Sequence, residues 1–362
     1  MQHYSGPNTH LINTRGARAQ LSTPALMLDL GIAEENIHVM MEHCQQTGQK
    51  LRPHGKSHKC STLAKKQLEA GAVGVCCATL REAEAMTTAG VKGVLVTSPI
   101  AGLAKIARLV QLNSQAEGFL AVVDNSTTVA LLSQAQRQQD PNKTLGLLVD
   151  LDIGTHRTGT SSSMEARALA MLIEESDNLA FYGIQAYAGH LQHIDDYSQR
   201  FEAMKVQAAL LSALVADLRS DGLQPQIVTG GGTGTYDIDH RFEVFTELQA
   251  GSYLFMDVQY NTVQLNDRRT HPFRPSLTVL ATVVSAVHDT HSVIDAGLKS
   301  FATDGPAPEL IDGAPTDSTY KFMGDEHGAI VYSSGTNETL TVGTTVSCMV
   351  PHCDPTVNLY DN

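Results

Sequence analysis

The sequence of 362 residues has no apolar run of the roughly 20 residues that a membrane-spanning helix needs. Its first residues, MQHYSGPNTHLINTRGARAQ, lack the apolar region of a signal peptide. Basic residues are also few, since 25 Lys and Arg face 38 Asp and Glu and give a formal net charge of −13. This charge disfavours binding to nucleic acid or to an anionic membrane. We therefore expect a soluble cytoplasmic protein that binds neither nucleic acid nor membranes.

Cysteine is scarce, with six residues in the chain, and several of them lie in apolar segments. This usage is typical of reduced thiols in a protein core rather than of a disulfide framework. The sequence also lacks internal repeats, low-complexity tracts and long linkers. With 42% hydrophobic and 17% charged residues, it has enough apolar material for one large core or two domains. A disordered or fibrous protein is excluded.

Most of the chain alternates short apolar segments with amphipathic helical ones, as in a parallel sheet covered by helices. Capping boxes at Thr79/Glu82 and Ser162/Glu165 predict where two of the helices begin. After a first strand at 25–30, eight strands are expected at 51–54, 73–78, 93–98, 120–125, 145–152, 181–189, 226–231 and 246–251. Eight strands separated by helices predict an α/β protein with a (β/α)₈ TIM-type barrel, which we assign to residues 31–262.

Beyond residue 262 the pattern changes to β-branched strands bounded by glycine. These strands are expected at 277–287, 291–298, 328–335 and 339–350, with no helical periodicity between them. We therefore expect a C-terminal antiparallel β domain of residues 263–362, together with residues 1–30. The boundary falls near the segment QLNDRRTHPFRP.

The segment LRPHGKSHK at 51–59 leaves the first barrel strand at its carboxyl end, where barrel enzymes place their active sites. A lysine at this end, Lys56, can form a Schiff base with a carbonyl cofactor or substrate if its pKa is lowered. The basic neighbours that are expected to lower it are Arg52, His54, His58 and Lys59. The alternative is a solvated basic loop, which is the commoner role of such a cluster.

Two loops follow the seventh and eighth barrel strands, where barrels frequently bind phosphate. The first, TGGGTGT at 229–235, is rich in glycine, so its backbone N–H groups can converge on an anion. The second is QAGSY at 249–253. The alternative for the first loop is a simple turn, because glycine-rich turns are common. Its position at the end of the barrel favours a phosphate site.

Two further segments leave the carboxyl ends of strands. In DLDIGTHRTG at 150–159, Arg157 can pair with an anionic or phenolate oxygen, while Asp150 and Asp152 can instead merely cap the loop. In YAGHLQH at 187–193, two histidines and Tyr187 can supply a general base and a ring that packs on a cofactor. A structural role for the histidines is the alternative.

Near the C-terminus, the segment PHCDPT at 351–356 places a histidine and an aspartate two residues apart. If the segment is extended, His352 and Asp354 project on one side and Cys353 on the other. An imidazole and a carboxylate together suit Mn²⁺, Zn²⁺ or Co²⁺. The alternative is a turn before proline that binds no metal.

Eight motifs, in this order, resemble the D-threonine aldolase and D-serine dehydratase group of pyridoxal-phosphate (PLP) enzymes. They are RPHGKSHK, DIGTHRTG, QAYAGHLQH, TGGGTGTY, ELQAGSYLFMD, DAGLKSFATDG, GDEHG and PHCDPTVNLYD. The resemblance extends from residue 23 to the last residues of the chain. It implies a barrel and a β domain of the alanine racemase type, which is fold type III of the PLP enzymes.

The resemblance also implies a role for each matching residue. Lys56 would hold PLP, Arg157 would meet its phenolic oxygen and Tyr187 would lie close to its ring. The residues that would hold the phosphate are Gly231, Gly232, Thr233, Gly234, Gly251, Ser252 and Tyr253. His352 and Asp354 match the family's metal pair, and His193 matches a histidine beside the metal. The expected divalent metal is Mn²⁺, with Zn²⁺, Co²⁺ or Mg²⁺ as alternatives.

The implied activity is retro-aldol cleavage of D-threonine and related D-3-hydroxy amino acids to glycine and an aldehyde. The metal would hold the β-hydroxyl, and His193 would take its proton as the Cα–Cβ bond breaks. Dehydration is the main alternative, because the same pocket can remove the Cα proton and expel hydroxide. In the resembling dehydratases the second metal ligand is typically cysteine, whereas Asp354 stands here, which favours the aldolase. A D-3-hydroxyaspartate aldolase fits the same motifs.

Two other functions are disfavoured by the metal pair. A noncatalytic PLP carrier tends to be a single barrel, and an alanine racemase has no role for His352 and Asp354. Related barrels commonly dimerise, so we expect a homodimer. Relatives usually continue past NLYD with another pair of short strands, whereas this chain stops at Asn362, so truncation of the β domain is an expectation.

Overall fold

The computed structural model describes residues 6–336 and 338–360. The last motif, PHCDPTVNLYD, therefore has its final residue, Asp361, outside the described part. The chain divides into two units, which we describe separately. The barrel unit comprises Ile37–Tyr253 and Val263–Pro272, and the β unit comprises Met1–Asn36, Leu254–Thr262 and Phe273–Asn362. Residues 31–36 and 254–262, which we expected in the barrel, belong to the β unit. Residues 263–272, which we expected in the β domain, belong to the barrel unit.

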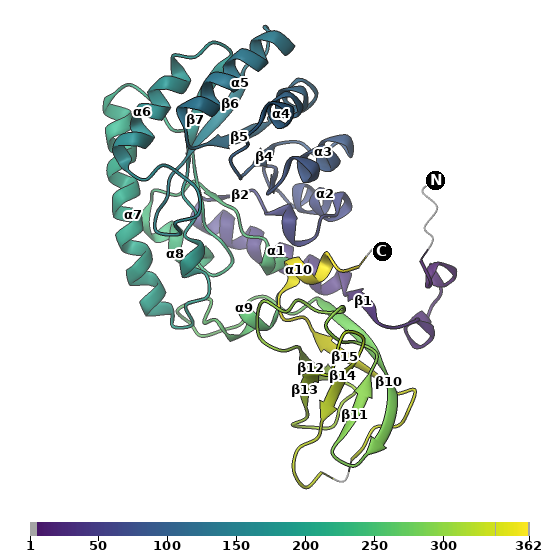
Figure 1. The fold of residues 1–362 in the computed structure, drawn as a ribbon. Coiled ribbons are helices and arrows are strands. Elements are labelled where there is room, and N and C mark those ends of the chain that lie inside the picture. The colour runs from purple at the N-terminus through teal and green to yellow at the C-terminus, as the bar shows by residue number, and fades with distance from the viewer. Residues whose placement is uncertain (1–5, 337, 361–362) are drawn as a thin grey trace. The chain divides into compact units, whose positions relative to one another are not determined.

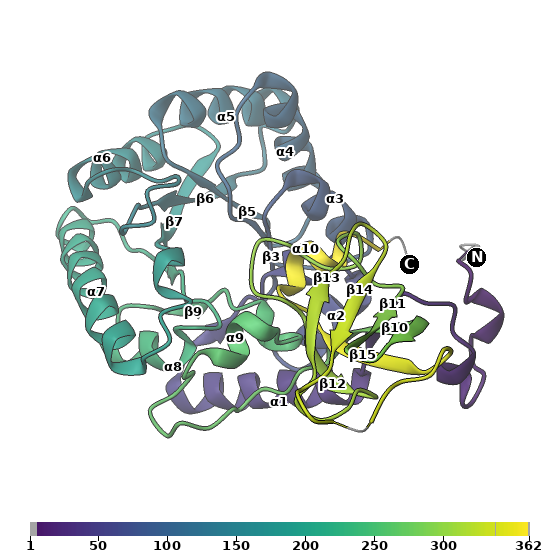
Figure 2. The same ribbon diagram turned by 60° about the horizontal axis from the view of Figure 1, so that its bottom comes forward.

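The barrel unit contains eight parallel strands with helices outside them (Figures 1 and 2). The strands are β2 (Lys50–Leu51), β3 (Val75–Cys77), β4 (Val94–Val96), β5 (Leu120–Val123), β6 (Leu145–Asp150), β7 (Leu179–Gln185), β8 (Ile227–Thr229) and β9 (Glu247–Leu248). Their order is β2-β9-β8-β7-β6-β5-β4-β3, and a parallel bridge between His54 and Cys76 joins the two ends of the sheet. All eight strands expected from the sequence are present, so the barrel prediction is confirmed.

The α-helices between residues 30 and 239 alternate with these strands, and the two with predicted capping boxes begin where those boxes indicate. They are α1 (Leu30–Thr47), α2 (Ser61–Glu69), α3 (Leu80–Thr88), α4 (Leu103–Gln115), α5 (Ser126–Gln139), α6 (Ser163–Glu174), α7 (Tyr197–Ser220) and α8 (Tyr236–Asp239). The hydroxyl of Thr79 accepts the N–H of Glu82, and that of Ser162 accepts the N–H of Glu165, as in capping boxes. Short 3₁₀ turns are η3 (Gly55–Ser57), η4 (Gly189–Leu191) and η5 (His240–Phe242).

The β unit is built on an antiparallel sheet in the order β12-β15-β10-β11-β14-β13, with β1 paired to β10. Its strands are β1 (Ala25–Leu28), β10 (Leu277–His288), β11 (His291–Ile294), β12 (Glu309–Asp312), β13 (Thr319–Phe322), β14 (Gly328–Val331) and β15 (Thr345–Met349). Its helical segments are η1 (Thr9–Leu11), η2 (Ala17–Gln20), α9 (Val258–Thr262) and α10 (Cys353–Val357), and η6 (Ser252–Leu254) precedes α9. The antiparallel β domain is thus confirmed. Strands β12 and β13 were not predicted, because these short edge strands are mostly exposed and carry no apolar run.

Candidate active site

Lys56 lies in η3, directly after strand β2, and is exposed. The backbone around it is set by His54, whose Nε2 lies 3.1 Å from the hydroxyl of Thr97. That hydroxyl donates its only proton to the carbonyl of Cys77, so Nε2 of His54 must be the donor to Thr97. The Nδ1 of His54 is then an acceptor, and it accepts the N–H of Lys56 at 3.4 Å. In this arrangement His54 is neutral and orients the Lys56 backbone.

Two of the four basic neighbours that are expected to lower the pKa of Lys56 have partners of their own in the barrel unit. Arg52 is buried and paired with Glu247 through two hydrogen bonds, at 2.9 Å from Nε and 3.0 Å from Nη2. Its charge is therefore compensated inside the barrel. His54 bonds to the hydroxyl of Thr97 and to the N–H of Lys56.

The glycine-rich loop follows β8 as predicted, and its glycines are required by close packing. A Cβ atom at position 231 would collide with the carboxylate of Asp239, and one at position 234 would collide with the carbonyl of Gln192. The N–H of Gly232 donates to the hydroxyl of Thr235 at 3.2 Å, and the N–H of Gly234 donates to Oε1 of Gln192 at 2.9 Å. Two of the four amides of residues 231–234 thus bond within the protein and set the shape of the loop.

The two predicted phosphate loops lie side by side. The N–H of Tyr253 donates to the hydroxyl of Thr233 at 2.9 Å, and both residues are buried. Gly251 lies against the segment before Lys56, since a Cβ atom there would come within 3.0 Å of the carbonyl of His54. The loops at 231–234, at 251–253 and around Lys56 therefore converge at the carboxyl ends of the barrel strands.

Arg157 and Tyr187 are also brought together, with the guanidinium 5.8 Å from the centre of the tyrosine ring. This is a cation–π contact between the loops after β6 and β7. Asp152 caps its own loop, because it accepts the N–H groups of Gly154 and His156 at 2.9 and 3.0 Å. The capping alternative thus holds for Asp152.

Asp150 has a different environment at the end of β6. It is buried, and it accepts hydrogen bonds from Gln185 Nε2 and from the Thr158 hydroxyl, both at 2.8 Å. Burial raises the pKa of Asp150, and the two hydrogen bonds partly oppose this shift. Asp150 belongs to the polar interior of the barrel rather than to a cap.

His193 follows η4 and is exposed. Its neighbour Gln192 is buried and was missed as a site residue. His190 is also exposed, and its Nδ1 lies 3.4 Å from the hydroxyl of Thr155. Of the two histidines in this segment, His190 therefore packs on the loop that carries Arg157.

The metal pair lies in the β unit, where the assumed extended conformation is wrong. Residues Cys353–Val357 form helix α10, with His352 as its N-cap and Asp354 in its first turn. Proline at position 355 is compatible with a first helical turn, because its missing N–H would have no helical partner there. Cys353 is fully buried, and its thiol donates to Oδ1 of Asp354 at 3.3 Å, so it does not lie apart from the pair as expected.

His352 has a carboxylate partner that the sequence did not reveal. Its Nδ1 lies 2.9 Å from Oδ2 of Asp304, which belongs to the DAGLKSFATDG motif. Within residues 6–336 and 338–360, no group of three or more His, Cys, Asp or Glu residues is arranged to hold a metal. The role of His352 and Asp354 as metal ligands thus stays a prediction.

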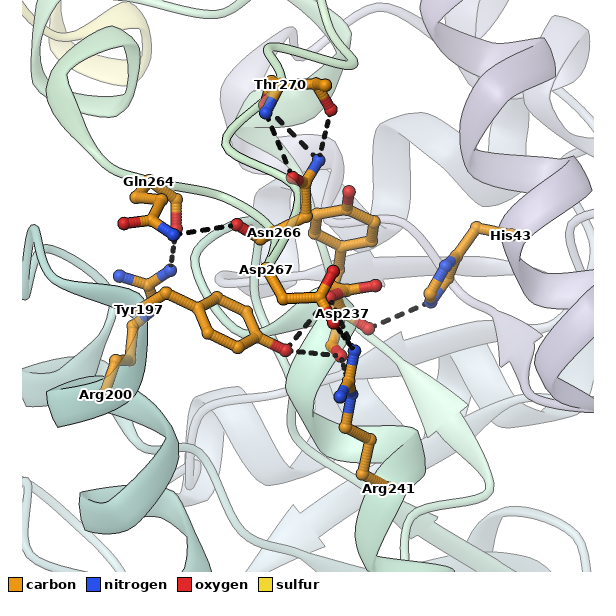
Figure 3. A network of polar contacts seen from close by, with 10 residues as sticks. His43, Tyr197, Arg200, Asp237, Arg241, Gln264, Asn266, Asp267 and Thr270 are labelled. Carbon is orange, nitrogen blue, oxygen red and sulfur yellow. Dashed lines mark hydrogen bonds and ion pairs between the residues drawn. The ribbon is translucent and has the colours of Figure 1, made fainter.

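A polar cavity of about 380 Å³ in the barrel unit was not predicted. It is lined by the end of α1, by α8 and η5, and by the loop at 266–272. Figure 3 shows polar contacts among side chains of these elements, including those of Asp237, Arg241 and Asp267. His43 donates from Nε2 to the carbonyl of Tyr236 at 3.0 Å, and its ring lies 5.3 Å from that of His240. Burial lowers the pKa of His43, and His240 lowers it further. His43 therefore resists protonation in the folded protein.

We expect this histidine to make the protein less stable in acid. Because the folded pKa of His43 lies below its ordinary value of 6.5, the unfolded chain binds the proton first as the pH falls. The charges that face His43 act in both directions, since Asp237 raises its pKa and Arg241 lowers it. The melting temperature should fall between about pH 7 and pH 5.

The variant His43→Gln tests this prediction, because glutamine can still donate to the Tyr236 carbonyl but does not titrate. Its melting temperature should depend less on pH over this range than that of the wild type. An unchanged pH profile would contradict the prediction. His38→Gln is the matched control, since His38 lies on the same helix and is exposed.

Comparison with known proteins gives two family matches. The family described as "Alanine racemase, N-terminal domain" matches residues 28–259, and "Putative serine dehydratase domain" matches residues 276–362.

None of the described helices is both long and apolar enough to cross a membrane.

Three curated relatives match nearly the whole chain. A D-threonine aldolase from Arthrobacter sp is 36% identical over 343 residues, which cover 95% of this chain and 88% of the relative. A 3-hydroxy-D-aspartate aldolase from Paracoccus denitrificans (strain Pd 1222) is 34% identical over 347 residues, with the same shares of both chains. A D-threo-3-hydroxyaspartate dehydratase from Delftia sp. (strain HT23) is 27% identical over 338 residues, covering 88% and 86%.

The fold has a close counterpart among solved structures. The crystal structure of a D-threonine aldolase from Filomicrobium marinum matches with a TM-score of 0.88 and 34% sequence identity. The match covers 95% of this chain and 90% of that one.

Proposed function

Because the chain belongs to the D-threonine aldolase and D-serine dehydratase family of alanine-racemase-fold enzymes, we propose that it is a PLP- and metal-dependent aldolase. Its substrates are D-threonine and related D-3-hydroxy amino acids, which it cleaves to glycine and an aldehyde. The observation that carries this proposal is the convergence of Lys56 with the loops at 231–234 and 251–253. The two aldolases at 34–36% identity support the reaction class.

The residues at the barrel end fit PLP. Side chains at positions 231, 232 and 234 would collide with Asp239 or Gln192, so the loop requires glycine there, and backbone amides in such a loop suit a phosphate. Lys56 would hold the aldehyde carbon of PLP, and Arg157 would face its phenolic oxygen. Tyr187, which already contacts Arg157, would pack on the ring. When bound, PLP supplies an electron sink for the pair released from the broken bond.

The remaining roles fall to three residues. His193 is exposed and is the proposed base that takes the proton of the substrate's β-hydroxyl as the Cα–Cβ bond breaks. His352 and Asp354 would hold the divalent metal, for which Mn²⁺ is our first choice. A bound metal of this kind would favour the ionised form of the hydroxyl.

We also propose that the protein is a cytoplasmic homodimer. It binds neither nucleic acid nor membranes, since its net charge of −13 disfavours anionic surfaces.

Two closely related functions are the alternatives. A D-3-hydroxyaspartate aldolase has the same reaction and differs in substrate, and the relative from Paracoccus denitrificans supports it. A dehydratase of D-serine or D-3-hydroxyaspartate would expel the hydroxyl instead, and the relative from Delftia supports that chemistry at lower identity. The aspartate at position 354 favours the aldolases.

Substrate comparison tests the proposal. The protein loaded with PLP and Mn²⁺ should release glycine from D-threonine and none from L-threonine. Glycine from L-threonine alone would overturn the assignment. A higher kcat/KM for D-3-hydroxyaspartate than for D-threonine would transfer the assignment to the hydroxyaspartate aldolase.

A further inference from the structure

We propose that Gln192, Thr235 and Asp239 form a directional hydrogen-bond relay that shapes the glycine loop for the cofactor's phosphate. Each is buried, and none of them was assigned a role from the sequence, although Thr235 and Gln192 lie in segments chosen there. The inference rests on the proposed function, because it takes the loop at 231–234 as the phosphate site. It makes these three side chains positioning residues, which act through the loop and do not touch substrate.

Thr235 is the centre of the relay, and its hydroxyl is fully used. It donates its one proton to Oδ2 of Asp239 at 2.9 Å. It accepts the N–H of Gly232 and a proton of Gln192 Nε2, both at 3.2 Å. One donor and two acceptor sites are all that a hydroxyl offers, so the direction of every bond is determined.

Gln192 connects the glycine loop to the segment that carries Tyr187 and His193. Its Nε2 donates to the carbonyl of Ala188 and to Thr235, both at 3.2 Å, and its Oε1 accepts the N–H of Gly234 at 2.9 Å. Both donors and the acceptor are engaged, which determines the orientation of the amide. A displacement of either loop would therefore break bonds at the other.

Asp239 closes the relay beneath the loop. It is fully buried, and its Oδ2 occupies the space that a side chain at position 231 would need. Burial raises the pKa of Asp239 to about 8, while the Thr235 hydrogen bond acts in the opposite direction. No basic side chain among the described residues pairs with Asp239. A carboxyl group that is mostly neutral near pH 7 can be buried at such a position.

Thr235→Val is the main test, because valine keeps the shape of threonine and removes the hydroxyl. The readout is the affinity for PLP divided by the affinity for pyridoxal, which has the same aldehyde and ring without the phosphate. This ratio isolates the phosphate's contribution to binding. We expect it to fall by about tenfold in the variant, because the three hydrogen bonds of the hydroxyl are lost together and the loop is no longer held in place. Thr235→Ser should restore it.

Thr246→Val is the matched control. The Thr246 hydroxyl also accepts a backbone N–H, that of Val228 in strand β8, at 2.9 Å, and the hydrogen bonds described for this hydroxyl involve Val228 and not residues 231–234. Its loss can lower the melting temperature while leaving the affinity ratio unchanged. Gln192→Glu is a second variant, since a carboxylate can accept the N–H of Gly234 but cannot donate to Thr235 or Ala188. It should lower the ratio as well.

The outcomes separate this inference from the proposed function. An unchanged ratio in both Thr235→Val and Gln192→Glu, with wild-type binding of PLP intact, would overturn the relay alone. If the wild type bound PLP no better than pyridoxal, the phosphate site itself would be refuted. A lower melting temperature of the cofactor-free variants with an unchanged ratio would assign these residues a purely structural role and contradict the inference.

Discussion

Lys56→Ala should bind no cofactor with visible absorbance and should lose activity on D-threonine by a factor on the order of a thousand or more. The physical reason is that the lysine amine makes the covalent link to PLP, for which no other side chain substitutes. Lys56→Arg should fail equally, because a guanidinium keeps the positive charge but does not lose its proton. Absorbance spectra of the purified proteins after PLP addition, with glycine release as the rate assay, measure both effects.

Lys65→Ala is the control for this prediction. Lys65 is exposed, lies in helix α2 nine residues further along the chain, and is not one of the basic neighbours expected to act on Lys56. Its variant should keep both the spectrum and the rate. A Lys56→Ala protein with the wild-type spectrum would show that the cofactor link lies elsewhere, and a fully active Lys56→Arg would reduce the role of the lysine to its charge.

Asp354→Ala should stop turnover while leaving PLP bound. The proposed metal acts on the substrate's hydroxyl and not on the cofactor ring, so the two readouts separate. We expect kcat to fall by about a hundredfold or more with saturating Mn²⁺. The visible spectrum should stay as in the wild type. Treating the wild type with a chelator should have the same effect, and added Mn²⁺ should reverse it.

Asp312→Ala is the matched control in the same unit. Asp312 is an exposed carboxylate in strand β12, where it pairs with Arg18 at 3.1 Å. Surface pairs of this kind contribute little to stability, so this variant should behave as the wild type. Equal rates with and without chelator would remove the metal from the mechanism, and an active Asp354→Ala would remove this ligand.

Much of the fold is predictable from local patterns. The apolar runs that form β5 and β6 are buried on both faces and therefore continuous, and the caps at Thr79 and Ser162 depend only on residues three positions apart. Strands β12 and β13 lack such a signal, because edge strands with one exposed face keep polar side chains. Helix α10 was missed because alternation alone cannot distinguish an extended pair from a first helical turn.

The placement of Lys56 and of the glycine loop at the carboxyl ends of the strands was predictable, whereas contacts between residues far apart in the sequence were not. Lys56 and the glycine loop follow from the rule that barrel enzymes use the carboxyl ends of their strands. The pair between Arg52 and Glu247 was not predicted, because the two residues are 195 positions apart in the sequence. Gln192 and Thr235 are 43 residues apart, and no local pattern indicates that their side chains meet.

The most direct test of the central claim is to identify the products that the wild-type protein forms from D-threonine with PLP and Mn²⁺. Our account predicts acetaldehyde and glycine in equal amounts, with both lost when a chelator is added. Formation of 2-oxobutanoate and ammonia would contradict it, because β-elimination rather than cleavage of the Cα–Cβ bond would then be the reaction of this site.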